Sequence, residues 1–264
     1  MIRVAVCLSG EPRTWAASYK NILEFFNVTK TIDGEAVEVD YFIHTWRGNS
    51  WREGSEWNFE TLSRDAVEPI GDVYKAKAFV NQPPKFRTTA IYGALFESQR
   101  RSFMLKRDYE LEHGFEYDVV VKARLDIVYE PGRKFNVHKP MMFSAYTTEY
   151  PFRMPREYNA SNFSEVLFYG DSPTMDLIGD THIHALRDCS WSVYHARTDT
   201  MRENIHMKYG PGAYMSFYMG QIGISSFPPP NQIIWAVVRK EAQLKGLDPI
   251  DDYDEIRDIH IKFY

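Results

Sequence analysis

The sequence predicts an α/β fold with a mixed, mostly parallel central sheet that is flanked by helices. Apolar runs of strand length alternate with longer segments whose apolar residues recur at helical spacing, a pattern typical of this class. Several short strand-like runs late in the chain indicate that the sheet is mixed. No strong linker divides the chain, so we expect one domain over 1–264, with 1–130 and 131–264 as its halves.

The first half of the chain contains the clearest elements. We expect strands over 2–9 and 37–46, a helix over 16–27, a helix and a short strand over 65–80, a loop over 81–86 and a helix from Thr88 to about Glu112. Residues 47–60 are polar, which is typical of a long exposed loop, and loops of this length are often functional lids. The apolar side of the last helix is predicted to consist of Ile91, Leu95, Phe96, Phe103, Met104 and Leu111.

The second half is predicted with shorter elements. Residues 117–130 read as one strand that is buried through Val121 and then becomes charged. Further predicted elements are strands over 141–146 and 165–171, a helix that starts at Ser172, a helix within 197–224 and a short strand in the tail over 255–264.

Composition limits the function classes. A formal net charge of −5 does not favour a non-specific nucleic-acid binder, although a local basic patch is compatible with it. Basic side chains gather along 75–107, where they form either a solvated face or a dock for an anionic acceptor. These residues are Lys75, Lys77, Lys85, Arg87, Arg100, Arg101, Lys106 and Arg107.

The chain is expected to act in the cytoplasm, which is the host cytoplasm if the protein is viral. It opens directly on a strand-like run, so the sequence predicts no signal peptide. No apolar run approaches the roughly 18 residues of a membrane span. Cys7 lies in the first apolar run and is expected in the core, and no C-x-x-C pair occurs.

Two strand ends carry the candidate chemistry. The apolar run Val4–Leu8 stops at Ser9-Gly10-Glu11-Pro12-Arg13, which is either a plain strand exit or a phosphate-binding turn. In 119–128, strand alternation predicts Lys122, Arg124 and Asp126 on one face. Charges are costly inside a sheet unless they are paired or bind something, and ligands bind at the carboxyl ends of strands in open α/β sheets. These side chains form either a ligand site or a structural ion pair.

The residue types at these ends suit a nucleoside-diphosphate ligand. Asp126 can hold a divalent metal together with diphosphate oxygens. Arg124 and Arg13 can clamp the phosphates in a bidentate manner and neutralise the charge of a leaving group. No Walker A, G-x-G-x-x-G, H-E-x-x-H or G-x-S-x-G motif is present, which removes support for ATPase, Rossmann oxidoreductase, zincin and α/β-hydrolase functions.

Four stretches together resemble one family, a group of GT-A-type glycosyltransferases of bacteria, phages and large viruses. "CLSGEPRTW" resembles their first-strand motif S-G-[QE]-x-R, and "DYFIHTW" resembles their second strand. "YDVVVKARLDIVY" is similar to their strand in which R-x-D replaces the D-x-D metal motif, and "NFSEVLFYGDSPTM" is similar to the acidic strand that follows. The resemblance covers about 1–170.

The resemblance implies a single Rossmann-like GT-A domain, with the nucleotide-sugar in the half 1–130 and the acceptor on the side of 131–264. It places Arg124 and Asp126 at the diphosphate, metal and donor sugar, with Mn²⁺ or Mg²⁺ as the metal. Glu165 falls near the acceptor, where it is either a general base or an exposed residue at the start of a strand, and Asp171 is a second candidate for the base. His260 is either a further metal ligand or a structural histidine. The residues expected around the nucleotide are Ser9, Gly10, Glu11, Arg13, His44 and Lys122.

The expected function is therefore transfer of a sugar from a nucleotide-sugar to a hydroxyl acceptor. The acceptor is a glycan or, as a sub-alternative, a hydroxymethylated base of phage DNA, which the net charge does not favour. Two alternatives stay open, a non-catalytic nucleotide- or glycan-binding protein on the same fold and a nucleotidyltransferase.

Overall fold

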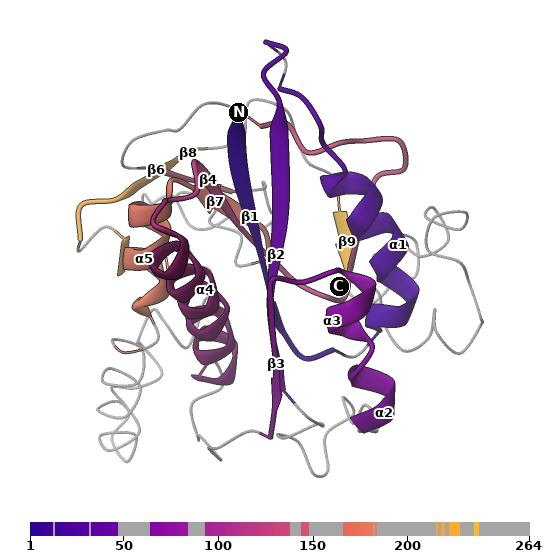
Figure 1. Cartoon of the computed structure of the whole chain (residues 1–264). Coiled ribbons are helices and arrows are strands. Elements are labelled where there is room, and N and C mark those ends of the chain that lie inside the picture. Colours follow the sequence, from indigo (N-terminus) through magenta and orange to yellow (C-terminus); the bar gives the residue numbers. More distant parts are fainter. Residues whose placement is uncertain are drawn as a thin grey trace, which may run out of the picture.

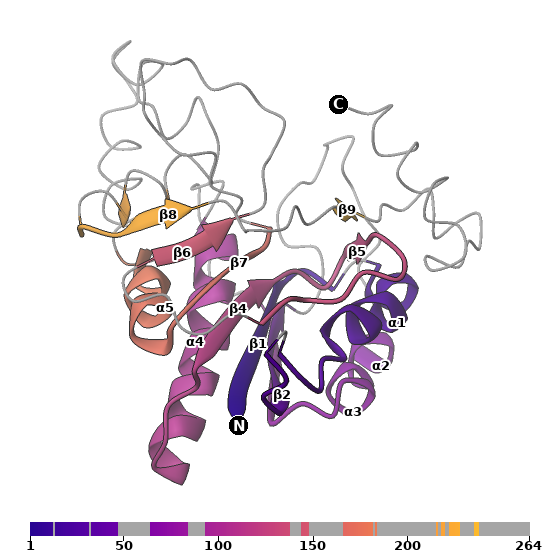
Figure 2. The same cartoon turned by 90° about the horizontal axis from the view of Figure 1, so that it is seen from above.

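The structure is a computed structural model, shown in Figures 1 and 2. It describes residues 1–12, 14–31, 33–46, 64–83, 93–137, 144–147, 166–181, 183, 215, 218–219, 222–227 and 235–237. Among the described residues, no helix combines the length and the apolar character that crossing a membrane requires.

The centre of the fold is a seven-stranded sheet in the order β3-β2-β1-β4-β7-β6-β8. Its strands are β1 (Ile2–Gly10), β2 (Val37–Trp46), β3 (Ala78–Gln82), β4 (Val119–Ala123), β6 (Ser144–Thr147), β7 (Phe168–Gly170) and β8 (Ser225–Phe227). β3, β2, β1 and β4 are parallel, and β6 is parallel to β8. β7 is antiparallel to both of its neighbours. The predicted mixed, mostly parallel sheet is confirmed.

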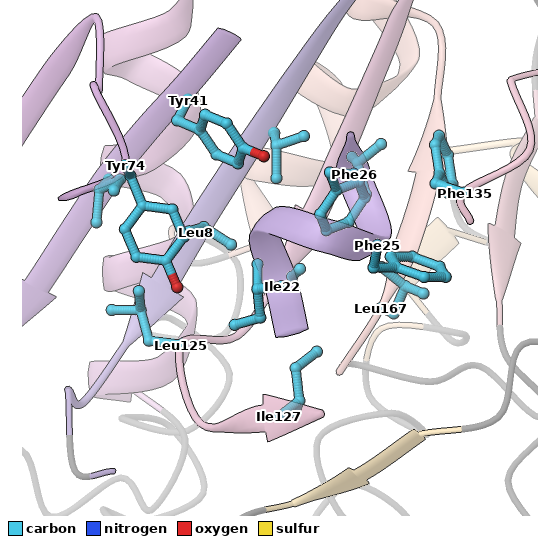
Figure 3. Packing of buried hydrophobic residues seen from close by; sticks show 14 of the residues in the cluster. Leu8, Ile22, Phe25, Phe26, Tyr41, Tyr74, Leu125, Ile127, Phe135 and Leu167 are labelled. Atoms are coloured by element: carbon cyan, nitrogen blue, oxygen red, sulfur yellow. The ribbon is translucent and has the colours of Figure 1, made fainter. Parts of the chain in front are cut away.

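Helices cover both faces of this sheet (Figure 2). α1 (Trp15–Phe26), α2 (Arg64–Val67) and α3 (Ile70–Val73) lie on one face, and α4 (Gly93–His113) and α5 (Ser172–Gly179) lie on the other. Alternate residues of β1 supply the two apolar cores. Val4, Val6 and Leu8 pack with α1, as Figure 3 shows for Leu8, Ile22 and Phe25. Ala5 and Cys7 pack with Phe96 and Phe103 of α4. The period-2 pattern of β1 therefore builds a three-layer α/β fold.

The early elements follow the sequence pattern closely. β2 spans the predicted 37–46, β1 ends one residue later than predicted, and α1 begins and ends one residue earlier than predicted. The segment 65–80 holds two short helices before β3. The predicted loop over 81–86 is wrong at its start, because β3 continues to Gln82, where Asn81 and Gln82 pair with Thr45 and Trp46 of β2.

The predicted strand over 117–130 is broken. β4 ends at Ala123, residues 124–126 form a bend, and β5 (Ile127–Tyr129) leaves the large sheet to pair with β9 (Trp235–Val237). Helix α1 holds the departing segment through hydrogen bonds to its backbone. Ser18 Oγ donates to Leu125 O, and the Asn21 side chain exchanges two hydrogen bonds with the backbone of Tyr129. These buried polar contacts favour the bend over a continued strand.

The predicted apolar side of the long helix is wrong in part. Phe96 and Phe103 are buried, but Met104 and Leu111 are 39% and 76% exposed. Their place is taken by polar side chains that α4 buries: Glu97, Ser98, Gln99, Ser102, Lys106 and Glu110. Periodicity alone misplaces this face because several of these groups find partners that are distant in the sequence.

Candidate functional site

The strand order creates a topological switch point between β1 and β4. From β1 the chain adds β2 and β3 on one side, and it then places β4 on the other side of β1. The register pairs Leu8 with Ala123, so Ser9-Gly10 at the end of β1 and Arg124 directly after β4 lie at the same edge of the sheet. Ligands of open α/β sheets bind in the crevice outside the carboxyl ends of the strands at such a point. The topology therefore brings the two candidate stretches together.

Arg124 and Asp126 form a bidentate ion pair in the bend after β4. Arg124 Nε lies 2.7 Å from Asp126 Oδ1, and Nη2 lies 2.7 Å from Oδ2. The Asp126 side chain is 2% exposed, whereas that of Arg124 is 18% exposed. A carboxylate held in this way fixes the plane of the guanidinium, and the Arg124 side chain stays more exposed than that of Asp126. The Arg124–Asp126 ion pair anticipated as the structural alternative is therefore present, and it lies at the switch point.

Lys122 lies in β4 itself, whereas Arg124 and Asp126 lie in the bend after it, which corrects the prediction that the three share one strand face. Lys122 lies within β4, between Cys7 of β1 and Phe168 of β7. Its side chain is buried on the face covered by α4, with Nζ 5.9 Å from the centre of the Phe168 ring. Alternation fails beyond Ala123 because the strand ends there.

The turn after β1 is open at Gly10. Gly10 has φ +120°, a conformation that L side chains rarely adopt, and no heavy atom of the described residues lies within 4 Å of the position of a Cβ. Its N–H is already used, because it donates to Ser98 Oγ of α4 at 2.8 Å. Ser9 is buried beside it, and Glu11 is half-buried. A ligand can thus approach the Cα side of Gly10, while the Gly10 amide serves to anchor α4.

His44 lies beside this turn, paired in register with Ser9. It is fully buried, and its Nδ1 is 2.8 Å from Ser98 Oγ. Burial, assisted by the nearby Arg101 guanidinium and opposed by Glu97, lowers the pKa of His44 to about 3. The imidazole is therefore neutral at physiological pH. The ring of Trp46 meets it nearly perpendicularly, with centroids 4.7 Å apart.

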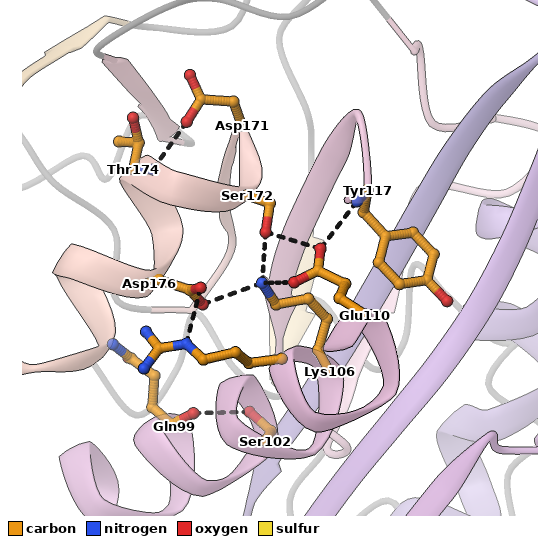
Figure 4. Close-up of polar contacts among 10 residues, drawn as sticks. Gln99, Ser102, Lys106, Glu110, Tyr117, Asp171, Ser172, Thr174 and Asp176 are labelled. Atoms are coloured by element: carbon orange, nitrogen blue, oxygen red, sulfur yellow. Dashed lines mark hydrogen bonds and ion pairs between the residues drawn. The ribbon is translucent and has the colours of Figure 1, made fainter. Parts of the chain in front are cut away.

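A second polar cluster joins α4 to α5 (Figure 4). Lys106, fully buried, reaches Glu110 Oε2 at 2.7 Å, Asp176 Oδ1 at 3.0 Å and Ser172 Oγ. Glu110 Oε1 accepts hydrogen bonds from Ser172 Oγ and from the N–H of Tyr117, each at 2.8 Å. Lys106 thus departs from the solvated basic face predicted for 75–107.

Asp171, the second candidate for a general base, caps helix α5. Its Oδ1 accepts the N–H of Thr174 at 2.8 Å, a contact that stabilises the first turn of a helix. The sequence "GDSP" carries this signal, since aspartate is favoured directly before a helix and proline within its first turn. The structure therefore gives Asp171 a structural role.

The predicted site is only partly covered by the described residues. Arg13, Glu165 and His260 lie outside them, as do residues 47–60. Sequence reasoning also missed Ser98, which joins Gly10 to His44. No local motif marks Ser98, because its partners are on β1 and β2, and only the polar face of α4 gives a hint.

The described residues do not by themselves fit a metal ion. Within the ranges that the structure describes, no group of three or more His, Cys, Asp or Glu side chains could hold one. Both carboxylate oxygens of Asp126 accept hydrogen bonds from Arg124. A cation at Asp126 would share these carboxylate oxygens with Arg124 and would take most of its ligands from elsewhere.

Comparison of the chain with models of known protein families gives no match, and comparison with curated proteins gives none either.

Proposed function

We propose that this protein is a glycosyltransferase that moves a sugar from a nucleoside-diphosphate donor to a hydroxyl acceptor. One observation carries the proposal: the open turn at Gly10 and the Arg124–Asp126 pair lie at the carboxyl ends of β1 and β4, on either side of the switch point. The motifs in these two stretches are those that resemble GT-A-type glycosyltransferases. The order β3-β2-β1-β4, which is common in nucleotide-binding folds, supports a GT-A assignment of the α/β sheet.

Arg124 is assigned to the diphosphate. Its guanidinium can donate two parallel hydrogen bonds to phosphate oxygens, and its charge opposes the negative charge that develops as the sugar leaves. Asp126 acts as a positioning residue, since it holds Arg124 through both of its carboxylate oxygens. Gly10 admits the ligand because its missing side chain leaves open space.

The metal and the acceptor site stay predictions from the resemblance. Mn²⁺ or Mg²⁺ would supply positive charge at the diphosphate when bound, and we derive no step through it because the described residues do not form its site. Glu165 is proposed as the base that deprotonates the acceptor hydroxyl, with a glycan as the first acceptor to test.

Calorimetric titration with UDP-, GDP-, CMP- and dTDP-sugars, each with and without Mn²⁺, tests the proposal. We expect one nucleotide class to bind, and Arg124→Ala to weaken that binding at least about tenfold, because it removes a charged hydrogen bond to phosphate. Arg133→Ala is the matched control, since it removes an exposed arginine from an ion pair with Glu130.

The outcomes separate the candidate functions. Binding followed by release of the nucleoside diphosphate, with transfer or hydrolysis of the sugar, supports the glycosyltransferase. Binding without turnover favours the non-catalytic binding protein, and pyrophosphate release from a nucleoside triphosphate favours the nucleotidyltransferase. No binding by any nucleotide-sugar, with or without Mn²⁺, rejects the proposed site.

A further inference from the structure

Ser98 lies at the centre of three contacts that join α4 to the ends of β1 and β2. Its hydroxyl oxygen is 2.8 Å from Gly10 N, 2.8 Å from His44 Nδ1 and 3.1 Å from the His44 carbonyl oxygen. Ser98 and His44 are both fully buried. The protons available to these groups determine which hydrogen bonds can exist together.

The count of protons fixes the tautomer of His44. Gly10 N–H can only donate to Ser98, and the single hydroxyl proton of Ser98 can serve one acceptor. When that proton goes to the His44 carbonyl, Nδ1 must carry a proton and donate to Ser98 Oγ. Only this arrangement satisfies all three contacts. The other nitrogen, Nε2, is then an unprotonated acceptor, and the low pKa of the buried ring keeps it so.

Nε2 of His44 is buried and has no hydrogen-bond partner among the described residues. Most buried polar atoms in proteins have one, and a missing partner destabilises the fold. Its place in the fold indicates the missing group. Ligands of open α/β sheets bind outside the carboxyl ends of the strands, and His44 lies near that end of β2.

We propose that His44 Nε2 accepts a hydrogen bond from the nucleoside of the bound nucleotide, from a ribose hydroxyl or from an imide N–H of the base. This inference rests on the proposed function, because it requires a nucleotide at the carboxyl ends of these strands. Ser98 is the positioning residue, since it sets the ring orientation and tautomer. Trp46, the last residue of β2, packs against the ring, and His44 is fully buried, so the ligand reaches Nε2 only when the packing around the ring opens.

Two substitutions of His44 separate its two nitrogens. In His44→Asn the side-chain amide lies near the position of the histidine Nδ1 and can still donate a hydrogen bond to Ser98, but no group replaces Nε2. In His44→Gln the side-chain amide lies near the position of Nε2, and the hydrogen bond that Nδ1 donates to Ser98 is lost. We expect His44→Asn to weaken binding of the nucleoside diphosphate that the wild type binds best, among UDP, GDP, CDP and dTDP, by roughly 3- to 10-fold. His44→Gln should weaken it less, and circular dichroism should show both variants folded.

Ligand analogues identify the donor in the nucleoside. The titration is repeated with the 2′-deoxy, the 3′-deoxy and, for a base with an imide, the N-methyl form of the bound nucleotide. We expect one analogue to bind the wild type more weakly than the parent nucleotide, and to bind His44→Asn as well as the parent does. That analogue names the ribose hydroxyl or the imide as the donor.

Three results would overturn the inference. Equal binding by His44→Asn and wild type would show that Nε2 meets only an internal water. Weaker binding by His44→Asn without coupling to any analogue would leave His44 as a structural residue. Either result leaves the proposed function intact if the wild type binds. Failure of the wild type to bind any nucleoside diphosphate or nucleotide-sugar would remove both proposals.

Discussion

Lys106 and Glu110, one turn apart on α4, form an ion pair that lies inside the protein, with 2.7 Å between Nζ and Oε2. The pair is completed by Ser172 and Asp176 of α5 and by the backbone N–H of Tyr117 ahead of β4. A buried charge is stable only when it is paired and hydrogen-bonded. This cluster therefore fixes α5 against α4 and against the entry to β4.

Replacement of Lys106 by alanine should lower the free energy of unfolding by about 3–5 kcal/mol, because it leaves the buried Glu110 carboxylate without its cation. Urea denaturation measures the change. Arg133→Ala, which breaks the exposed pair with Glu130, is the control and should cost less than about 1 kcal/mol. A loss at Lys106 no larger than that of the control would show that the cluster does not stabilise the fold.

The buried His44 predicts a loss of stability in acid. The folded pKa is about 3 and the unfolded value is about 6.5, so the unfolded chain binds more protons between these values. The stability that a neutral His44 provides is complete above the unfolded pKa and is lost as the pH falls toward the folded one. Between pH 7 and pH 5 the loss should be about 2 kcal/mol.

Urea denaturation of wild type and His44→Gln at the two pH values isolates this contribution. Other groups titrate in both proteins, so the prediction concerns the difference between their pH dependences. The variant should lose about 2 kcal/mol less than the wild type on acidification. Parallel pH dependences would mean that His44 is protonated in the folded protein.

Gly10→Ala should destabilise the protein by about 1–3 kcal/mol, because φ +120° is strained for any L side chain. The added methyl group meets no neighbour, so the cost comes from the backbone alone. Gly132→Ala is the matched control, with φ +73° and equally open space, and should be strained less because non-glycine residues do visit that region. Thermal unfolding ranks the two variants, and an unchanged Tm for Gly10→Ala would contradict the strain.

Asp126→Asn should abolish sugar transfer and weaken donor binding at least about tenfold, while far-UV circular dichroism stays unchanged. The amide keeps the shape of the carboxylate but loses the charge that orients Arg124. Glu130→Gln, which neutralises an exposed carboxylate four residues later, is the control. Full activity of Asp126→Asn would reject the assignment of this pair to the site.

The sequence predicts best where an element's own residues determine it. β1 and β2 are complete apolar or alternating runs, and α1 carries a full helical period, so their bounds agree within a residue. The bend after Ala123 is different, because "KARLDIVY" has strand character throughout. The bend is held by Ser18 and Asn21, which the sequence places about a hundred residues earlier.

Some residues of the candidate site can likewise be found from the sequence, whereas others become evident only in the fold. Arg124 and Asp126 are prominent in the sequence because charges are rare at the end of an apolar strand. Ser98 and Gln99 of α4 look like ordinary surface residues, and only the fold shows them buried. A polar helix face that contacts the core gives no apolar period, so a method based on hydrophobic spacing cannot find it.

After β4 the chain leaves the seven-stranded sheet at Arg124, and this determines whether the first half of the protein can fold as a separate fragment. β5, which directly follows Asp126, pairs with β9, so that Val128 lies opposite Ala236. A fragment that ends at residue 130 would carry the candidate diphosphate residues but would leave the backbone groups of β5 unpaired, as an edge open to aggregation. During synthesis β5 stays unpaired until β9, about a hundred residues later, has been made. Strand pairings between residues so far apart in the sequence form slowly. Expression of the first half alone should therefore give an aggregating product.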